Sequence, residues 1–181
     1  MVFSEEKGGR SIEVYFDDFV TNPRDEYEHP GRLLCWHRRL ILGGREDQHV
    51  SRRFNPRAYD GWEELEQAVV EEFEPVAMLP VYLFEHSGVA LQTTPFNDPW
   101  DSGRVGLIVA GRTEVLKVWG DDALKEQVET ALRAEVQEYS QYLNGAVYGY
   151  AVKDVATGEI IDSCSGIYGD LDEVLKMAEW R

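Results

Sequence analysis

The chain has 181 residues, of which 43% are hydrophobic and 12% aromatic, so it can fold around one full-sized core. Its 34 acidic and 18 basic residues give a formal net charge of −16, which disfavours direct nucleic-acid binding and contact with anionic membrane surfaces. No apolar run reaches the roughly 18 residues of a spanning helix, and the first residues lack a secretory-signal pattern. We therefore expect a cytoplasmic protein without membrane contact.

The basic residues are concentrated in one segment. Residues 31–60 contain seven arginines and three acidic residues, a local balance of +4 that leaves −20 for the rest of the chain. The two cysteines, Cys35 and Cys164, have no metal-ligand spacing. We expect both thiols to be reduced and buried, and we expect no metal and no cofactor.

The N-terminal part alternates loop and strand signals. Residues 1–10 are polar and predict a flexible N-terminus, whereas the alternating pattern over residues 11–19 predicts the first strand. Residues 33–42 predict the second strand, with His37 and Arg39 on one face and Arg38 on the other. Residues 45–61 have no periodic pattern and predict an irregular connection.

Helical spacing of apolar residues recurs over residues 62–74 and 121–143 and predicts two long amphipathic helices, with a further helical segment at 113–119. The outer faces of both long helices are acidic, so they could attract a basic partner or simply keep the protein soluble. The candidates for a partner-binding surface are Glu63, Glu64, Glu71, Glu126, Glu129 and Glu135.

Residues 81–84, 89–92 and 104–110 predict three strands in the middle of the chain. The loops between them gather polar and aromatic side chains, and loops held at the end of a sheet are frequent binding sites. Together with the basic residues of the second strand they form our set of candidate ligand-binding residues, which are His37, Arg38, Arg39, His86, Ser87, Trp100, Asp101 and Ser102.

The C-terminal part predicts a hairpin over residues 146–169, followed by a short helix that Asp170 caps. The order of the elements predicts a single α+β domain over residues 11–181. We expect a mainly antiparallel sheet of about five to seven strands, with helices on one face.

Several segments resemble a family of small, uncharacterised proteins of bacteriophages and mobile elements. The resemblance covers residues 21–169 and is carried by Asn22-Pro23-Arg24, by HRR-x-x-LG from His37, by Y-x-x-x-HSG from Tyr82, by PF-x-x-PWDSG from Pro95, and by the segments 142–145 and 147–149. Family members often have a cysteine at the position of Asp98 and an aspartate at that of Gly44, which argues against a thiol nucleophile or a required carboxylate there. The resemblance implies a phage-encoded accessory protein and no particular reaction.

Our main hypothesis is a binding protein that inhibits a host defence factor, using the acidic helices or the arginine-rich segment as its contact surface. A second hypothesis is a protein that sequesters a nucleotide-like molecule, with Trp100 stacking on a ring and arginines holding phosphate. The oligomeric state, including a homo-oligomer, is left open.

A third hypothesis is a hydrolase in which a histidine is the general base, an aspartate orients it and an arginine holds an anion. The residues available for these roles are His37, His86, Asp98, Asp101, Arg38 and Arg39. His37, His86 and Asp101 have no metal-binding spacing, and no complete catalytic motif is present. Binding without catalysis therefore remains the main expectation.

Overall fold

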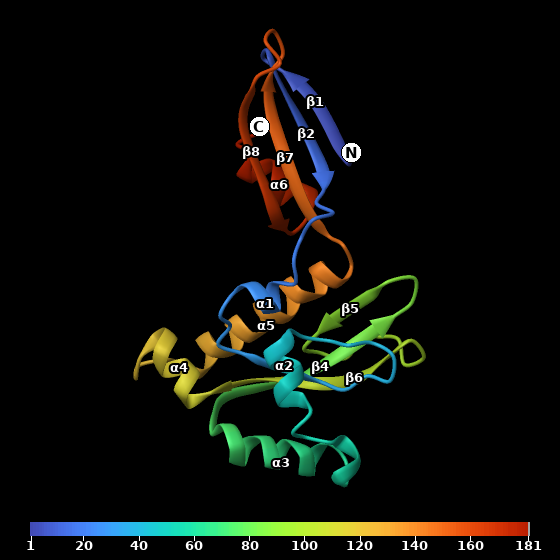
Figure 1. Ribbon diagram of the computed structural model, residues 1–181, viewed down its shortest axis with the longest axis vertical. Helices are drawn as coiled ribbons and strands as arrows, with labels where there is room; N and C mark the ends of the chain where they lie inside the picture. The colour runs from blue at the N-terminus through green and yellow to red at the C-terminus, as the bar shows by residue number, and fades with distance from the viewer. Residues whose placement is uncertain (181) are drawn as a thin grey trace. The chain divides into compact units, whose positions relative to one another are not determined.

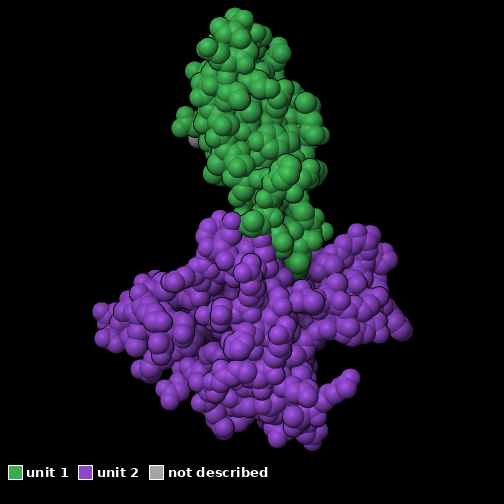
Figure 2. Space-filling view, in the orientation of Figure 1, with its two compact units in different colours: residues 1–21, 141–181 green, residues 22–140 purple. Residues whose placement is uncertain are grey.

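The structure is a computed structural model that describes residues 1–180. Its contacts divide the chain into two compact units, residues 1–21 with 141–181 and residues 22–140, where the sequence suggested one domain (Figure 2). Each unit has its own antiparallel sheet of four strands. The predicted α+β class and antiparallel pairing are confirmed, but the described residues form eight strands in two sheets.

The first unit is a sheet with one helix on its face (Figure 1). The strand order is β1-β2-β7-β8, and the elements are β1 (Phe3–Lys7), β2 (Arg10–Phe16), β7 (Val147–Asp154), β8 (Ile160–Tyr168) and α6 (Leu171–Met177). The N-terminus expected to be flexible forms β1, whose Phe3 lies opposite Val14. The predicted β7–β8 hairpin and the Asp170 cap of α6 are confirmed. Ile12, Val14, Tyr150, Val152, Ile167 and Val174 form the core.

The second unit contains the other sheet and most of the helices (Figure 1). Its strand order is β3-β6-β4-β5, with β3 (Arg32–Cys35), β6 (Ser102–Gly111), β4 (Pro75–Glu85) and β5 (Val89–Gln92). Its helices are α1 (Pro23–Glu26), α2 (Arg45–Ser51), the 3-10 helix η1 (Pro56–Ala58), α3 (Trp62–Phe73), α4 (Arg112–Trp119) and α5 (Lys125–Leu143), whose last three residues belong to the first unit.

Helices cover both faces of the second sheet, which corrects the expectation of one covered face. Leu107 and Val109 of β6 pack with Leu65 and Val69 of α3. Ile108 points the opposite way, as alternation along a strand requires, and lies beside Leu132 of α5. Burial on both faces explains why β6 is apolar along most of its length.

The second predicted strand is shorter than expected, because β3 ends at Cys35. The next residue still donates its N–H to the carbonyl of Val105, but the ring of His37 then accepts backbone hydrogen bonds from Arg39 and Leu40. A side chain that bonds its own backbone competes with the strand ladder. The side-chain alternation expected for residues 37–39 is therefore wrong.

The predicted irregular connection at 45–61 instead contains α2 and η1. Helix α2 begins with a capping contact, in which Gly44 N donates to Asp47 Oδ2 at 3.0 Å. Asp47 is itself held by a buried arginine from a distant segment. Long-range contact therefore stabilises a helix that has no amphipathic pattern of its own.

Strand β4 begins at Pro75 and runs through Pro80, although these prolines were expected to precede it. Proline lacks an N–H and is tolerated where no ladder bond is required on that side. Strand β5 pairs with β4 only from Tyr82 onward, so Pro80 lies on a stretch that β5 does not reach.

Candidate functional site

Three segments of the second unit meet at one end of its strands. Phe84 near the end of β4 pairs with Ser102 at the start of β6, and Trp36 after β3 bonds to Val105 of β6. They surround a cavity of about 440 Å³, which we call the His37 hollow. Six of the eight candidate ligand-binding residues line it, namely His37, Arg38, Arg39, Trp100, Asp101 and Ser102.

His37 is positioned as a hydrogen-bond donor. Its Nδ1 atom accepts from Leu40 N at 3.1 Å and from Arg39 N at 3.4 Å, so the proton of the neutral ring is on Nε2. The Nε2 atom lies 4.0 Å from Glu85 Oε2, and the side chain is only 14% exposed. A ring with this tautomer can donate one hydrogen bond toward a ligand, whereas the general-base role considered for His37 is disfavoured.

The cationic groups of the hollow differ in how they are paired. Arg39 Nη2 lies 2.7 Å from Glu85 Oε2. Arg104 pairs with Glu66 and stacks over the ring of Trp62. Arg38 has no acidic partner within residues 1–180, so its guanidinium is available to an anion.

His86 forms a dyad with Asp101 at the rim of the hollow. His86 Nδ1 lies 2.8 Å from Asp101 Oδ2, which places the Nδ1 proton toward the carboxylate and leaves the Nε2 lone pair free. The ring lies beside Phe84, which also contacts Phe96. This orientation is suitable for a general base, although His86 is 68% exposed.

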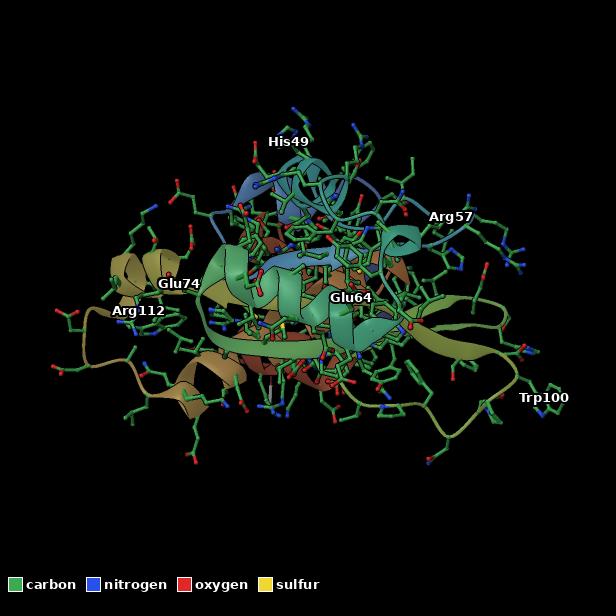
Figure 3. All side chains as sticks on the ribbon, turned by 90° about the horizontal axis from the view of Figure 1, so that it is seen from below. His49, Arg57, Glu64, Glu74, Trp100 and Arg112 are labelled. Carbon is green, nitrogen blue, oxygen red and sulfur yellow. The ribbon has the colours of Figure 1, made fainter. Side chains whose placement is uncertain are left out.

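The loop that carries the dyad is held by Asp98. Its carboxylate accepts from Trp100 N at 2.9 Å and from Asp101 N at 3.1 Å. Ser102 Oγ donates its proton to the carbonyl of Asp98 and therefore does not direct it toward a general base. The turn presents Trp100, which is 92% exposed and projects outward (Figure 3). Ser87, in the turn after β4, does not line the hollow.

The chemistry available at the hollow is therefore acid–base chemistry and anion binding. Within residues 1–180 no three histidine, cysteine or carboxylate side chains are grouped closely enough to hold a metal ion.

Cys35 and Cys164 are free, and loss of solvation raises the pKa of the Cys35 thiol. The described helices include none that is both long and apolar enough to cross a bilayer.

The acidic candidates fall into two groups. Glu63, Glu64 and Glu71 of α3 are exposed, and so is Glu126 of α5 (Figure 3 labels Glu64). Glu129 is half-buried and pairs along its own helix with Lys125 and Arg133. Among the candidate residues, the exposed negative charges are therefore most numerous on α3.

Glu135 is not a surface residue, which corrects its assignment to the partner-binding set. It is 8% exposed and lies 2.6 Å from Arg24 Nη1, and its other oxygen accepts from Gly31 N. Arg24 also forms two bonds to Asp47, at 2.9 and 3.0 Å. We call Arg24, Asp47 and Glu135 the buried ionic cluster.

The buried ionic cluster joins α1, α2 and α5. Burial alone would lower the pKa of Arg24, but the hydrogen bonds and charges of Asp47 and Glu135 outweigh it and raise this pKa. The partners of Arg24 lie 23 and 111 residues away along the chain. Neither periodicity nor spacing indicated them, and Arg24 was marked only by the segment that carries the phage-family resemblance.

Neither a protein-family model, nor a curated protein, nor a solved structure matches this chain. The resemblance to the phage family therefore remains a hypothesis that rests on the segments quoted above.

Proposed function

We propose that the protein binds a small anionic ligand with an aromatic ring, such as a nucleotide, in the His37 hollow. The observation that carries this proposal is the convergence of six candidate residues from three segments on one cavity. The volume of the hollow lies in the range of small-molecule sites, and its mostly polar lining suits a charged ligand. In an acidic protein, the local excess of arginine is the part that attracts an anion.

The phosphate, the polar atoms and the aromatic ring of such a ligand each have a suitable contact in the His37 hollow. The free guanidinium of Arg38 can bind a phosphate, because arginine presents paired donors that match phosphate oxygens. His37 Nε2 supplies a neutral donor from a largely buried ring. The exposed indole of Trp100 offers a face on which a nucleobase can stack.

The test is a fluorescence titration of the full chain with ribonucleoside mono-, di- and triphosphates. A stacked base quenches Trp100, and Trp100→Phe removes that signal while the other tryptophans remain. We expect Arg38→Gln to weaken binding roughly 10-fold through loss of a charge-assisted bond. The control Arg133→Gln makes the same charge change on α5, where the side chain pairs with Glu129. Equal losses in both variants, or no quenching by any nucleotide, would refute the proposal.

Analysis of the nucleotide after these titrations shows whether the protein only binds it or converts it into a product. If the nucleotide is recovered unchanged by mass spectrometry, the protein is a sequestering protein. If product accumulates and His86→Gln stops it without changing affinity, the protein is a hydrolase in which His86 activates water and Asp101 orients it.

A second candidate function is contact with a host protein through α3. Glu63, Glu64, Val70 and Glu71 are exposed, and the seven-residue spacing between the two adjacent pairs places them on one side of this helix. An acidic face with an exposed apolar residue favours a partner with a basic, partly apolar surface. In the phage setting we propose, this partner is a defence factor that the protein inhibits.

The test is capture of host proteins by the tagged chain at low and moderate salt. Glu63→Lys with Glu71→Lys reverses charge on α3, and the control Glu126→Lys reverses one on α5. We expect a stoichiometric partner that is lost with the α3 variant and as salt rises. Retention of the same partner by the α3 variant would refute this function.

A further inference from the structure

A second cavity in the same unit has a different electrostatic character from the rest of the protein. It has a volume of about 470 Å³ and lies between the segment after β3, the end of α2 and η1. Its lining includes Arg38, Arg52 and Arg57, and we call it the arginine cavity. Figure 3 labels Arg57 on the short η1 turn.

The lining of the arginine cavity contains no aspartate or glutamate among the described residues. Three other cavities all include carboxylates, for example Glu28 in one, Glu85 in the His37 hollow and Asp121 in a third. Cys35 is also a lining residue of the arginine cavity, and because burial raises the pKa of its thiol it adds no negative charge. In a chain with a net charge of −16, three positive charges here are not balanced locally.

The three guanidinium groups are also unpaired. Arg38, Arg52 and Arg57 have no carboxylate partner within residues 1–180, although the neighbouring Arg53 pairs with Glu72 and Arg39 pairs with Glu85. Like charges around one cavity repel each other, and a bound anion relieves this repulsion. Unpaired arginines in a strongly acidic protein therefore indicate an anion-binding site.

The backbone around the cavity is held in place before any ligand binds. Arg52 is the C-cap residue of α2, and its N–H bonds to the carbonyl of Gln48. Arg57 lies in η1, where Asn55 accepts from its N–H and Pro56 restricts the first position. Because the backbone is already fixed, only the arginine side chains have to become ordered when an anion binds, which lowers the entropy lost on binding.

From these observations we propose that the arginine cavity binds the polyphosphate group of a small molecule. Arginine forks match phosphate oxygens in pairs, and three guanidiniums suit an anion with several charges. Ile41, Leu42 and Pro56 add an apolar wall for the organic part of such a ligand. This site shares His37 and Arg38 with the His37 hollow, so the assignment rests on Arg52 and Arg57, which line the arginine cavity and not the hollow.

The test is calorimetric titration of the full chain with sodium tripolyphosphate, without metal ions, at about 150 mM salt. We expect saturable binding with one site per chain. Arg52→Gln and Arg57→Gln should each weaken it roughly 10-fold, because each removes a charge-assisted contact. All the substituted side chains are exposed, and circular dichroism checks that the variants are folded.

Arg53→Gln is the matched control. It makes the same charge change next to Arg52, but its side chain pairs with Glu72 and does not line the cavity. We expect this control to change the affinity less than about 2-fold. An equal loss in Arg53→Gln, or no binding by the unmodified chain, would overturn the assignment.

Two further titrations distinguish the arginine cavity from the His37 hollow and from a nucleic-acid site. Trp100→Phe should leave the affinity for tripolyphosphate unchanged. A nucleotide titration without quenching, which refutes ligand binding in the His37 hollow, is therefore a different result from the absence of tripolyphosphate binding, which refutes the arginine cavity. A short oligothymidylate should not compete, because the surrounding acidic surface repels a long polyanion. Effective competition would overturn the small-molecule assignment in favour of a nucleic-acid backbone.

Discussion

Glu135→Gln tests directly whether this side chain belongs to the buried ionic cluster or to an acidic surface. The carboxylate receives Arg24 Nη1 at 2.6 Å and Gly31 N at 3.1 Å on its two oxygens. An amide of the same shape can accept only one of these bonds, because its NH₂ group faces a donor in either orientation. The substitution therefore removes one charge-assisted bond and creates a donor–donor contact in a buried place.

The expected cost follows from these contacts. Loss of a hydrogen bond to a charged group destabilises a protein by about 2 to 3 kcal/mol. Arg24 keeps both bonds to Asp47, so the remaining pair stays neutral and the loss stays below that of an isolated buried charge. Arg24→Gln should cost more, because it leaves Asp47 and Glu135 as two neighbouring buried carboxylates. For an exposed glutamate the same change costs less than about 0.5 kcal/mol.

The assay is urea unfolding followed by tryptophan fluorescence, with Trp36 and Trp62 reporting on the unit that contains the cluster. Glu126→Gln is the control, since it makes the same change at an exposed position of α5. We expect the order of stability to be control, then Glu135→Gln, then Arg24→Gln. Equal free energies of unfolding for Glu126→Gln and Glu135→Gln would refute the reasoning.

The remaining predictions concern packing, pH and reactivity. Gly106→Ala should prevent stable folding, because the added Cβ would lie 2.0 Å from the carbonyl oxygen of Leu34, and thermal unfolding measures this. Burial and the bond to Asp162 raise the pKa of Tyr150 from 10.0 to about 12. Its contribution to stability is therefore present below pH 10 and is lost toward pH 12, which unfolding of Tyr150→Phe across this range measures. Alkylation of Cys35 should be slow until the protein unfolds, because its raised pKa leaves little thiolate, as peptide mass spectrometry can show.

Each of these predictions has a clear contrary result. A Gly106→Ala variant as stable as the unmodified chain would contradict the close approach of β3 and β6. A constant difference in stability between the chain and Tyr150→Phe from pH 10 to pH 12 would contradict the raised pKa. Rapid alkylation of Cys35 in the folded protein would contradict the uncharged thiol.

Local patterns in the sequence determined much of the secondary structure. Helix α3, strand β6 and the β7–β8 hairpin lie where apolar spacing and turn residues placed them. These signals are local, because a helix or strand with one buried side repeats its apolar residues at a fixed period. Six of the candidate residues singled out in the sequence line the His37 hollow, because polar and aromatic side chains in and beside predicted strands are visible without a structure.

Only the tertiary structure decided which of these residues meet. Strand β3 ends early because His37 bonds its own backbone, and this turn brings Arg38 and Arg39 to the start of β6. Helix α2 has no amphipathic pattern and is held by Asp47, whose partner Arg24 lies 23 residues earlier.

Glu135 shows that the sequence alone also did not indicate which acidic residues lie on the surface. Its position on a helix with an acidic outer face indicated exposure, but Arg24 pairs with it from 111 residues away and buries it. A charge enters a protein interior only when an opposite charge compensates it, and that compensation depends on contacts between distant segments. The sequence alone determined the elements that have a clear apolar period, whereas the buried ionic cluster and the convergence of the candidate residues on one cavity were decided by the fold.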